Sequence, residues 1–472
     1  MKIAAKVGNL DDAPKGFVRV VLTDKSKGTK RFVKEGEVET LEMGVGKSGE
    51  LNLRKFRILC RAIINTAKAN KIKKIALQFD KTPELFKCLD NISQDEAAQI
   101  VAENFEMANY EFNHFKTAPK DGWDTVEEVL AYMSTPLRVD AGIAKGQAIG
   151  RAVNECRTLA NTPGGDVTPT TLAKAAKDAM KGLPVKVTIL GKKEMEKLGM
   201  GALLGVAKGS TEAPTFTILE YKGGGKGAPI VLAGKGVTFD SGGLNLKPSN
   251  GIYEMHMDMS GAAAVIHTVA LAARLELKKN VIGLLPSVEN MPGNQAYRPG
   301  DVLKSLSGKT IEVLNTDAEG RLILADALTY AKRFKPAVVV DAATLTGAAM
   351  VALGVYASGI MTRDDALAEK ILAAAEESGD YAWRLPLWDE YEDAVKGSFA
   401  DITNSSVQQG GRYGGAIEGG MFLWQFAKEL ECPWVHLDIA PRMTAAPGDE
   451  LAKGAAGAPV RLMLRFIEQW TG

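Results

Sequence analysis

Between residues 229 and 346 the chain alternates apolar runs, nearly free of charge, with stretches of helix length. The runs 229–234 (PIVLAG) and 280–286 (NVIGLLP) have the length of strands, and 258–277 and 319–334 have the length and composition of helices. Strands that are apolar throughout are buried on both faces, as in a parallel sheet covered by crossover helices. We therefore predict an α/β fold whose larger, C-terminal domain contains a mostly parallel central sheet.

The N-terminal part of the chain predicts a small α/β domain. Strands are expected at 17–23 and 73–79, and helices at 51–70 and 93–110. Periodicity is lost over 113–137, and a long helix follows. The expected organisation is an N-terminal α/β domain of unknown role (1–135), a linker helix (136–165) and a domain that carries the chemistry (166–472). The glycine-rich stretch 408–420 is expected to be a loop.

Composition excludes several classes of protein. With 58 lysines and arginines against 57 acidic residues, the chain lacks the basic excess of a nucleic-acid or anionic-membrane binder. Its four cysteines form no CxxC pair, which argues against a disulfide framework or a cysteine zinc site and indicates a reducing compartment. The N-terminus reaches acidic residues before any long apolar run, so we expect no signal peptide, no transmembrane span and a cytoplasmic location.

Two short segments concentrate side chains that can hold metal. They are KGVTFDSGGLNLKP (235–248) and NTDAEGRL (315–322), and each follows an apolar run. Asp317 and Glu319 would face the same side if their segment were extended. Carboxylates suit divalent cations, and a pair of such ions is a common device for hydrolysis. The four histidines form no HExxH pair. The segments therefore predict a two-metal hydrolase.

These segments resemble the signatures of the leucine aminopeptidase, or cytosol aminopeptidase, family (peptidase family M17). The resemblance extends from about Asn154 to the C-terminus, through ENMPGNQAYRPGDVL (289–303), DAATLTGA (341–348), GDYAWRLPL (379–387) and HLDIA (436–440). It implies a metal-dependent leucyl aminopeptidase that releases N-terminal residues from peptides, prefers leucine but is broad in specificity, and assembles as a homohexamer. The first 150 residues carry no recognised motif.

The resemblance also implies two divalent ions per subunit, Mn²⁺ or Zn²⁺, and a role for each charged residue. Asp240 and Glu319 would bridge the two ions, Asp317 would complete one site and Asp258 the other, and Lys235 would ligate as a neutral amine. Two further residues would be catalytic. Lys247 would stabilise the oxyanion, and Arg321 would hold a bicarbonate ion that serves as the proton shuttle.

The resemblance places a substrate pocket beside the metals. Its expected residues are Met255, Asn315, Thr344, Leu345, Gly347, Ala440 and Met443. Flexible methionines suit an apolar site that accepts leucine or methionine. The chain departs from the family at Pro441 and Arg442, where a glycine and a small apolar residue are expected.

Two alternatives remain open from the sequence. One is a dipeptidase of the Cys-Gly type, which the same site would support. The other is a DNA-binding or scaffolding hexamer with secondary peptidase activity, although the balanced charge makes nucleic acid an unfavourable partner.

Overall fold

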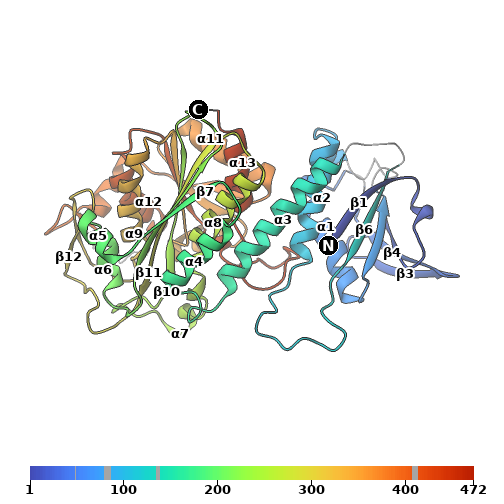
Figure 1. The fold of residues 1–472 in the computed structure, drawn as a ribbon, viewed down its shortest axis with the longest axis horizontal. Coiled ribbons are helices and arrows are strands. Elements are labelled where there is room, and N and C mark those ends of the chain that lie inside the picture. The colour runs from blue at the N-terminus through green and yellow to red at the C-terminus, as the bar shows by residue number, and fades with distance from the viewer. Residues whose placement is uncertain (48, 79–86, 134–138, 407–412, 472) are drawn as a thin grey trace. The chain divides into compact units, whose positions relative to one another are not determined.

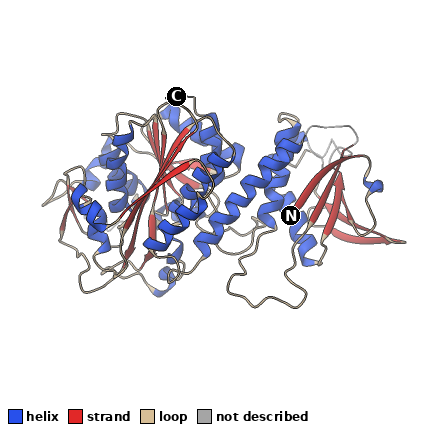
Figure 2. Cartoon of the chain, viewed as in Figure 1, coloured by secondary structure: helices blue, strands red, loops and turns tan. Residues whose placement is uncertain are grey.

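Residues 1–154, together with the segment 447–453, form one unit, and residues 155–446 and 454–472 form a second, larger one (Figure 1). The computed structural model describes all residues except 48, 79–86, 134–138, 407–412 and 472. Both units combine strands with helices (Figure 2), so the predicted α/β class is confirmed. The domain limits 1–135, 136–165 and 166–472 stay a prediction.

The smaller unit contains, among its described residues, a six-stranded sheet of order β1-β6-β5-β2-β4-β3. Every neighbouring pair is parallel except β3 and β4. The strands are β1 (Lys2–Val7), β2 (Val18–Thr23), β3 (Lys30–Glu35), β4 (Val38–Gly44), β5 (Lys74–Gln78) and β6 (Glu128–Met133).

Two helices cover the apolar side of this sheet. Helix α1 (Leu53–Ala69) begins where the Asn52 side chain accepts a hydrogen bond from the Lys55 amide at 2.9 Å, and α2 (Gln94–Ala108) packs against α1. Phe56 and Ile63 of α1 lie in one buried cluster with β2 and β5. A third helix, α3 (Asp140–Asn161), crosses the limit between the two units.

The larger unit is built on a nine-stranded sheet in the part of the chain that is described. Its order is β16-β15-β18-β14-β9-β11-β8-β7, with β10 paired to β11. Strands β9, β10, β11, β14 and β18 run parallel to one another, whereas β7, β8 and β15 introduce antiparallel pairs. The strands are β7 (Val185–Leu190), β8 (Thr215–Lys222), β9 (Ile230–Gly234), β10 (Gly236–Asp240), β11 (Asn280–Asn290), β14 (Val338–Ala343), β15 (Ser358–Met361), β16 (Ala382–Arg384) and β18 (Trp434–Asp438).

Helices lie on both sides of this sheet (Figure 2). Helices α4, α8, α11 and α13 pack together in one layer, and α6, α9 and α12 in the other. The helices are α4 (Pro169–Ala179), α5 (Lys192–Leu198), α6 (Gly201–Ala207), α7 (Ser249–Ile252), α8 (Ser260–Arg274), α9 (Gly320–Ala331), α10 (Gly347–Leu353), α11 (Asp365–Ser378), α12 (Gly415–Ala427) and α13 (Val460–Gln469).

The glycine-rich stretch 408–420 is only partly a loop. Gly415 to Gly420 form the first turns of α12, so the loop prediction is wrong there; residues 408–412 lie outside the described part. Small residues on this helix permit close packing, since a Cβ on Gly420 would lie 2.6 Å from Met361 Sδ. Packing against the sheet thus overrides the low helix propensity of glycine.

A small three-stranded sheet, β12 (Val302–Lys304), β13 (Thr310–Glu312) and β17 (Ile402–Thr403), stands beside the main one. No helix of the described residues has the length and apolarity needed to cross a membrane. The parallel strands β9, β10, β11, β14 and β18 end at the same edge of the main sheet, where α/β folds place their ligands.

Candidate metal centre

The strand ends deliver the first charged side chains. Lys235 follows β9 directly, and Asp240 is the last residue of β10. Asp258 lies in the turn before α8, held close to the sheet because α8 carries Gly261 where a Cβ would lie 2.1 Å from the Ala342 carbonyl oxygen of β14. All three side chains are almost fully buried.

Asp317 and Glu319 come from the turn between β13 and α9. The expectation that both side chains share one face assumed an extended segment, and this assumption does not hold, since residues 316–317 form a turn and Glu319 has helical dihedral angles at the N-cap of α9. The turn nevertheless brings both carboxylates to the strand edge. Gly320 allows the approach, because a Cβ there would lie 2.6 Å from the Lys235 side chain.

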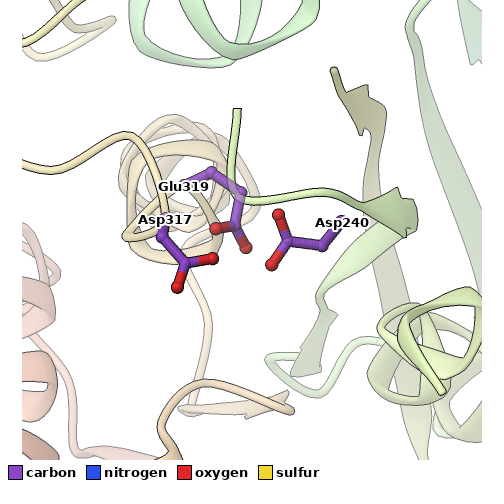
Figure 3. A group of neighbouring side chains, drawn as sticks. All are labelled: Asp240, Asp317 and Glu319. Carbon is purple, nitrogen blue, oxygen red and sulfur yellow. The ribbon is translucent and has the colours of Figure 1, made fainter. Parts of the chain in front are cut away.

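The carboxylates of Asp240, Asp317 and Glu319 point toward one another (Figure 3). One oxygen from each lies within 4.8 Å of the others. Asp258 stands outside this group of three, but its Oδ2 lies 2.8 Å from Lys235 Nζ, which also lies 2.9 Å from Glu319 Oε1. The five residues predicted as metal ligands therefore meet in one place.

Lys247 reaches the same cluster from the loop after β10. Its Nζ lies 2.8 Å from Asp240 Oδ2 and 2.5 Å from Asp317 Oδ1. Unlike Lys235, the side chain keeps some access to solvent, with 16% exposed against 3%. Lys247 is thus the lysine that a solvent-borne substrate could contact.

Burial raises the pKa values of the three aspartates of the cluster. The pKa of Asp258 is raised well above its usual value by burial, with a further contribution from Glu319 that Lys235 opposes. Burial likewise raises the pKa of Asp240 and of Asp317. These groups therefore bind protons, or other positive charge, more strongly than exposed carboxylates do.

The pKa values of the two lysines are raised, although burial alone would lower them. Burial lowers the pKa of Lys235, but the carboxylates of Asp258 and Glu319 outweigh it, and the pKa lies above its ordinary value. The pKa of Lys247 is raised for the same reason, chiefly by Asp240. Both amines are therefore ammonium ions as long as the carboxylates have no other counter-charge.

The donor set fits divalent cations. Four carboxylates face two ammonium groups, so the cluster is negative when all are ionised. Glu319 Oε2 is buried and has no hydrogen-bond partner among the described residues. Unpaired buried oxygens are costly unless a cation or a donor satisfies them. Clustered carboxylate oxygens are ligands for Mn²⁺, Mg²⁺ and Zn²⁺.

Arg321 is the second residue of α9 and is buried. Its Nη1 donates to the Asn404 carbonyl oxygen at 2.8 Å, whereas Nε has no hydrogen-bond partner within the described residues. Burial lowers the pKa of Arg321, opposed mainly by Glu418. An arginine in this state keeps at least one unpaired N–H that a planar anion could accept from.

Comparison with known proteins decides the family. A model described as the cytosol aminopeptidase family catalytic domain matches residues 154–464, and one for the N-terminal domain of that family matches residues 40–119. The chain belongs to the cytosol aminopeptidase family. It is accordingly a metal-dependent aminopeptidase, a hydrolase that acts on peptides. The family resemblance predicted from the two signatures is confirmed, and it extends into the N-terminal region, where the sequence showed no recognised motif.

Individual relatives agree over nearly the whole chain. A probable cytosol aminopeptidase of Burkholderia multivorans is 42% identical over 97% of this chain and 91% of its own. Among solved structures, the bottromycin maturation enzyme BotP in complex with Mn has a TM-score of 0.85 and 31% identity, covering 96% of this chain and 99% of its own. A tomato leucine aminopeptidase mutant has a TM-score of 0.87 and 29% identity, covering 100% and 97%.

Three of the predicted pocket residues of this aminopeptidase adjoin the candidate metal ligands. Thr344 Oγ1 donates to Asp258 Oδ1 at 2.7 Å, and the Thr344 carbonyl accepts from Lys235 at 2.8 Å. Asn315 Oδ1 accepts from the Asp317 amide at 2.9 Å. Met255 begins the short turn that ends at Asp258. These three residues thus adjoin metal-ligand candidates directly.

Two of the other predicted pocket residues, Leu345 and Ala440, are joined by a residue that the sequence did not single out. Asp438, the last residue of β18, accepts from the amides of Leu345 and Ala440, each at 3.2 Å. Gly347 opens α10, which packs against the turn Ala440–Arg442 just before Met443. These contacts join the loops after β14 and β18.

Asn290 was also missed. Its Nδ2 donates to Asp240 Oδ1 at 2.8 Å and to the Thr316 carbonyl at 2.9 Å, so it links the two signature segments. Tyr297 donates to the same carbonyl at 2.6 Å. Asn290, Tyr297 and Asp438 lie inside segments that matched the family, and that match was the signal that could have identified them.

Proposed function

We propose that this chain releases N-terminal amino acids from peptides, with a preference for leucine within a broad range, through a centre of two divalent ions. The observation that carries the proposal is the convergence of Asp240, Asp317 and Glu319 within 4.8 Å, beside two buried or half-buried lysines. Bound divalent ions supply an activated water and polarise the scissile carbonyl. Either Mn²⁺ or Zn²⁺ suits these ligands, and the Mn complex of BotP supports the former.

The family resemblance gives the ligand roles, and the contacts support them. Asp240 and Glu319 would bridge the ions, Asp317 would complete one site, and Asp258 with Lys235 the other. Lys235 would ligate as a neutral amine, because metal charge would replace the ammonium charge that Asp258 and Glu319 now attract. The hydrogen bonds from Thr344 to Asp258 and from Asn290 to Asp240 would orient those carboxylates.

Lys247 and Arg321 would be the catalytic side chains. Lys247 carries a compact positive charge at the partly exposed side of the cluster, suited to an oxygen on which negative charge develops. Arg321 would hold a bicarbonate ion through its unpaired Nε, two residues after Glu319 in the chain. A proton carrier would then stand near the leaving amine without a histidine.

Substrate selection would fall to the loops after β14 and β18. Thr344, Leu345, Gly347, Ala440 and Met443, with Met255 and Asn315, would line the pocket for the first side chain. Leucine preference is supported by the likeness to the tomato leucine aminopeptidase. We further propose a cytoplasmic homohexamer in which residues 166–472 form the catalytic domain, residues 136–165 the linker helix, and residues 1–135 the N-terminal domain.

The test is hydrolysis of leucine p-nitroanilide by chelator-treated protein that is then refilled with Mn²⁺ or Zn²⁺. Glu319→Ala is assayed alongside, with Glu220→Ala, which removes a glutamate paired to Lys186 on β7, as the matched control. We expect metal to restore activity to the unmutated protein and the control, and not to Glu319→Ala. Absence of hydrolysis by refilled unmutated protein would refute the proposal.

A second assay separates aminopeptidase from dipeptidase activity. Leucine amide, Cys-Gly and leucine-initiated peptides of increasing length are compared at equal concentration. We expect longer peptides and the amide to be cleaved, because the proposed ligands engage only the first residue and the scissile bond. Confinement of activity to dipeptides would identify a Cys-Gly-type dipeptidase instead.

A further inference from the structure

The segment that carries Asp317, Glu319 and Arg321 lacks support from regular structure at its start. Between the end of β13 at Glu312 and the first residue of α9 at Gly320, the backbone forms neither strand nor helix. A segment of this kind must be held by contacts from elsewhere if its carboxylates are to keep fixed positions. Asn404, which follows β17, supplies such contacts.

The Asn404 side chain is fully buried, and all of its hydrogen-bonding capacity is directed at this segment. Oδ1 accepts from the amides of Leu314 at 2.8 Å and Asn315 at 3.3 Å. Nδ2 donates to the carbonyl oxygens of Asn315 at 2.6 Å and Ala318 at 3.3 Å. A primary amide offers two donors and can accept two bonds, so the group is saturated.

The Asn404 backbone extends the same attachment. Its amide donates to the Glu312 carbonyl at 3.0 Å, and its own carbonyl accepts from Arg321 Nη1 at 2.8 Å. One residue therefore contacts the segment at its beginning, in its middle and at the arginine beyond it.

The small sheet sets the position of Asn404. Strand β17 pairs in parallel with β13, with Ile402 opposite Ile311 and Thr403 opposite Glu312. The next residue along β17 therefore lies beside the start of the loop. Asp401 Oδ2 strengthens the pairing by accepting from the Thr310 amide at 2.8 Å.

We propose that Asn404 is a positioning residue for the metal centre, which holds Asp317 and Glu319 for metal and Arg321 for its anion. The proposal rests on the ligand and catalytic roles proposed above. It requires asparagine in particular, because an aspartate would place a carboxylate oxygen against the carbonyls of Asn315 and Ala318. An alanine would leave two amides and two carbonyls without their partner.

The experiment compares Asn404→Asp, which keeps the volume, and Asn404→Ser, which keeps one hydroxyl, with the unmutated protein. Chelator-treated proteins are titrated with Mn²⁺ by calorimetry, and kcat and KM for leucine p-nitroanilide are measured at saturating Mn²⁺. We expect Mn²⁺ affinity to fall about 10- to 100-fold, as for other residues that orient metal ligands. We also expect kcat to fall at saturating Mn²⁺ while KM changes less than kcat.

The matched control is Asn104→Ser in the smaller unit. Asn104 is also fully buried, accepts from Arg61 Nε at 2.7 Å and donates to the Ile100 carbonyl at 2.7 Å. Its replacement should lower the melting temperature but leave Mn²⁺ affinity and kcat unchanged. A general loss of stability is thereby separated from a loss of positioning.

Unchanged Mn²⁺ affinity and kcat in both Asn404 variants would overturn the proposal, even if their melting temperatures fall. Unmutated protein that binds Mn²⁺ but cleaves no aminoacyl substrate would refute the proposed function alone, and the Mn²⁺ affinities would still decide the role of Asn404. Unmutated protein that binds neither Mn²⁺ nor Zn²⁺ in the same titration would overturn both.

Discussion

Lys235 Nζ lies 2.9 Å from Glu319 Oε1, and both side chains are almost fully buried. Lys235 Nζ is also 2.8 Å from Asp258 Oδ2, so one ammonium group serves two buried carboxylates. Removal of one partner from a buried ion pair leaves an uncompensated charge, which costs far more than the loss of an exposed pair. The stability of the metal-free protein should therefore depend on Lys235.

Lys235→Met is expected to lower the free energy of unfolding of chelator-treated protein by about 3–5 kcal/mol. Mn²⁺ should recover part of the loss, because it supplies charge to the same carboxylates. The measurement is urea unfolding with chelator and with Mn²⁺. Lys15→Met, which removes an exposed pair with Glu37, should cost less than about 1 kcal/mol in both conditions. If Lys235→Met loses the same unfolding free energy with and without Mn²⁺, then Lys235 and the metal do not act on the same carboxylates.

Lys247→Ala is expected to lower kcat about 10²- to 10³-fold, the usual cost of removing a group that stabilises developing negative charge. Lys247→Arg should not restore the rate, because a planar guanidinium cannot take the place of a compact ammonium between Asp240 and Asp317. Steady-state kinetics at saturating metal tests this. The exposed Lys208→Ala serves as control and should retain kcat. Full activity of Lys247→Ala would exclude the proposed role.

Arg321→Met should remove the dependence of the rate on bicarbonate. The unmutated protein is expected to accelerate when bicarbonate is added to carbonate-free buffer, since the unpaired Nε of Arg321 would bind the anion. The variant should be slow at every bicarbonate concentration. Initial rates across a bicarbonate titration provide the measurement. If both proteins respond equally, the anion acts elsewhere.

The buried Asp326 should make the stability of the protein depend on pH, independently of metal binding. It is buried in α9, accepts from the amides of Leu203 at 2.9 Å and Leu306 at 2.7 Å, and burial raises its pKa from 3.8 to about 7. Between these two pH values the folded protein holds a proton that the unfolded chain has lost. The contribution of Asp326 to stability is thus present below about pH 3.8 and is lost as the pH rises through 7.

Asp326→Asn cannot titrate, so its stability should rise relative to the unmutated protein across that window. The difference in unfolding free energy between the variant and the unmutated protein should change by a few kcal/mol over this pH range, since one pKa unit corresponds to about 1.4 kcal/mol. Urea unfolding of both chelator-treated proteins at several pH values between about 4 and 8 provides the test. A difference that does not vary with pH would show that Asp326 keeps an ordinary pKa.

Local pattern was enough to predict the α/β class and the helices and strands around the site. The continuous apolar run at β9 and the alanine-rich α8 can be buried only in a sheet covered by helices, so composition alone constrains them. The extended conformation assumed for Asp317–Glu319 does not occur, because the segment is held as a turn by hydrogen bonds from distant residues. Asn404, more than 80 residues away in the chain, supplies several of them.

The residue types of the centre could be identified from the sequence, because carboxylates and lysines at these spacings are typical of a metal site. Family membership and the crossover architecture follow from those same local signals. Only the tertiary structure decided that Asp258 reaches the cluster through Lys235, that Asp438 joins the loops after β14 and β18, and that Asn404 and Asn290 hold the signature segments. Hydrogen bonds between a side chain and backbone far away in the sequence depend on how the chain folds back on itself. The periodicity of the sequence does not specify this long-range arrangement.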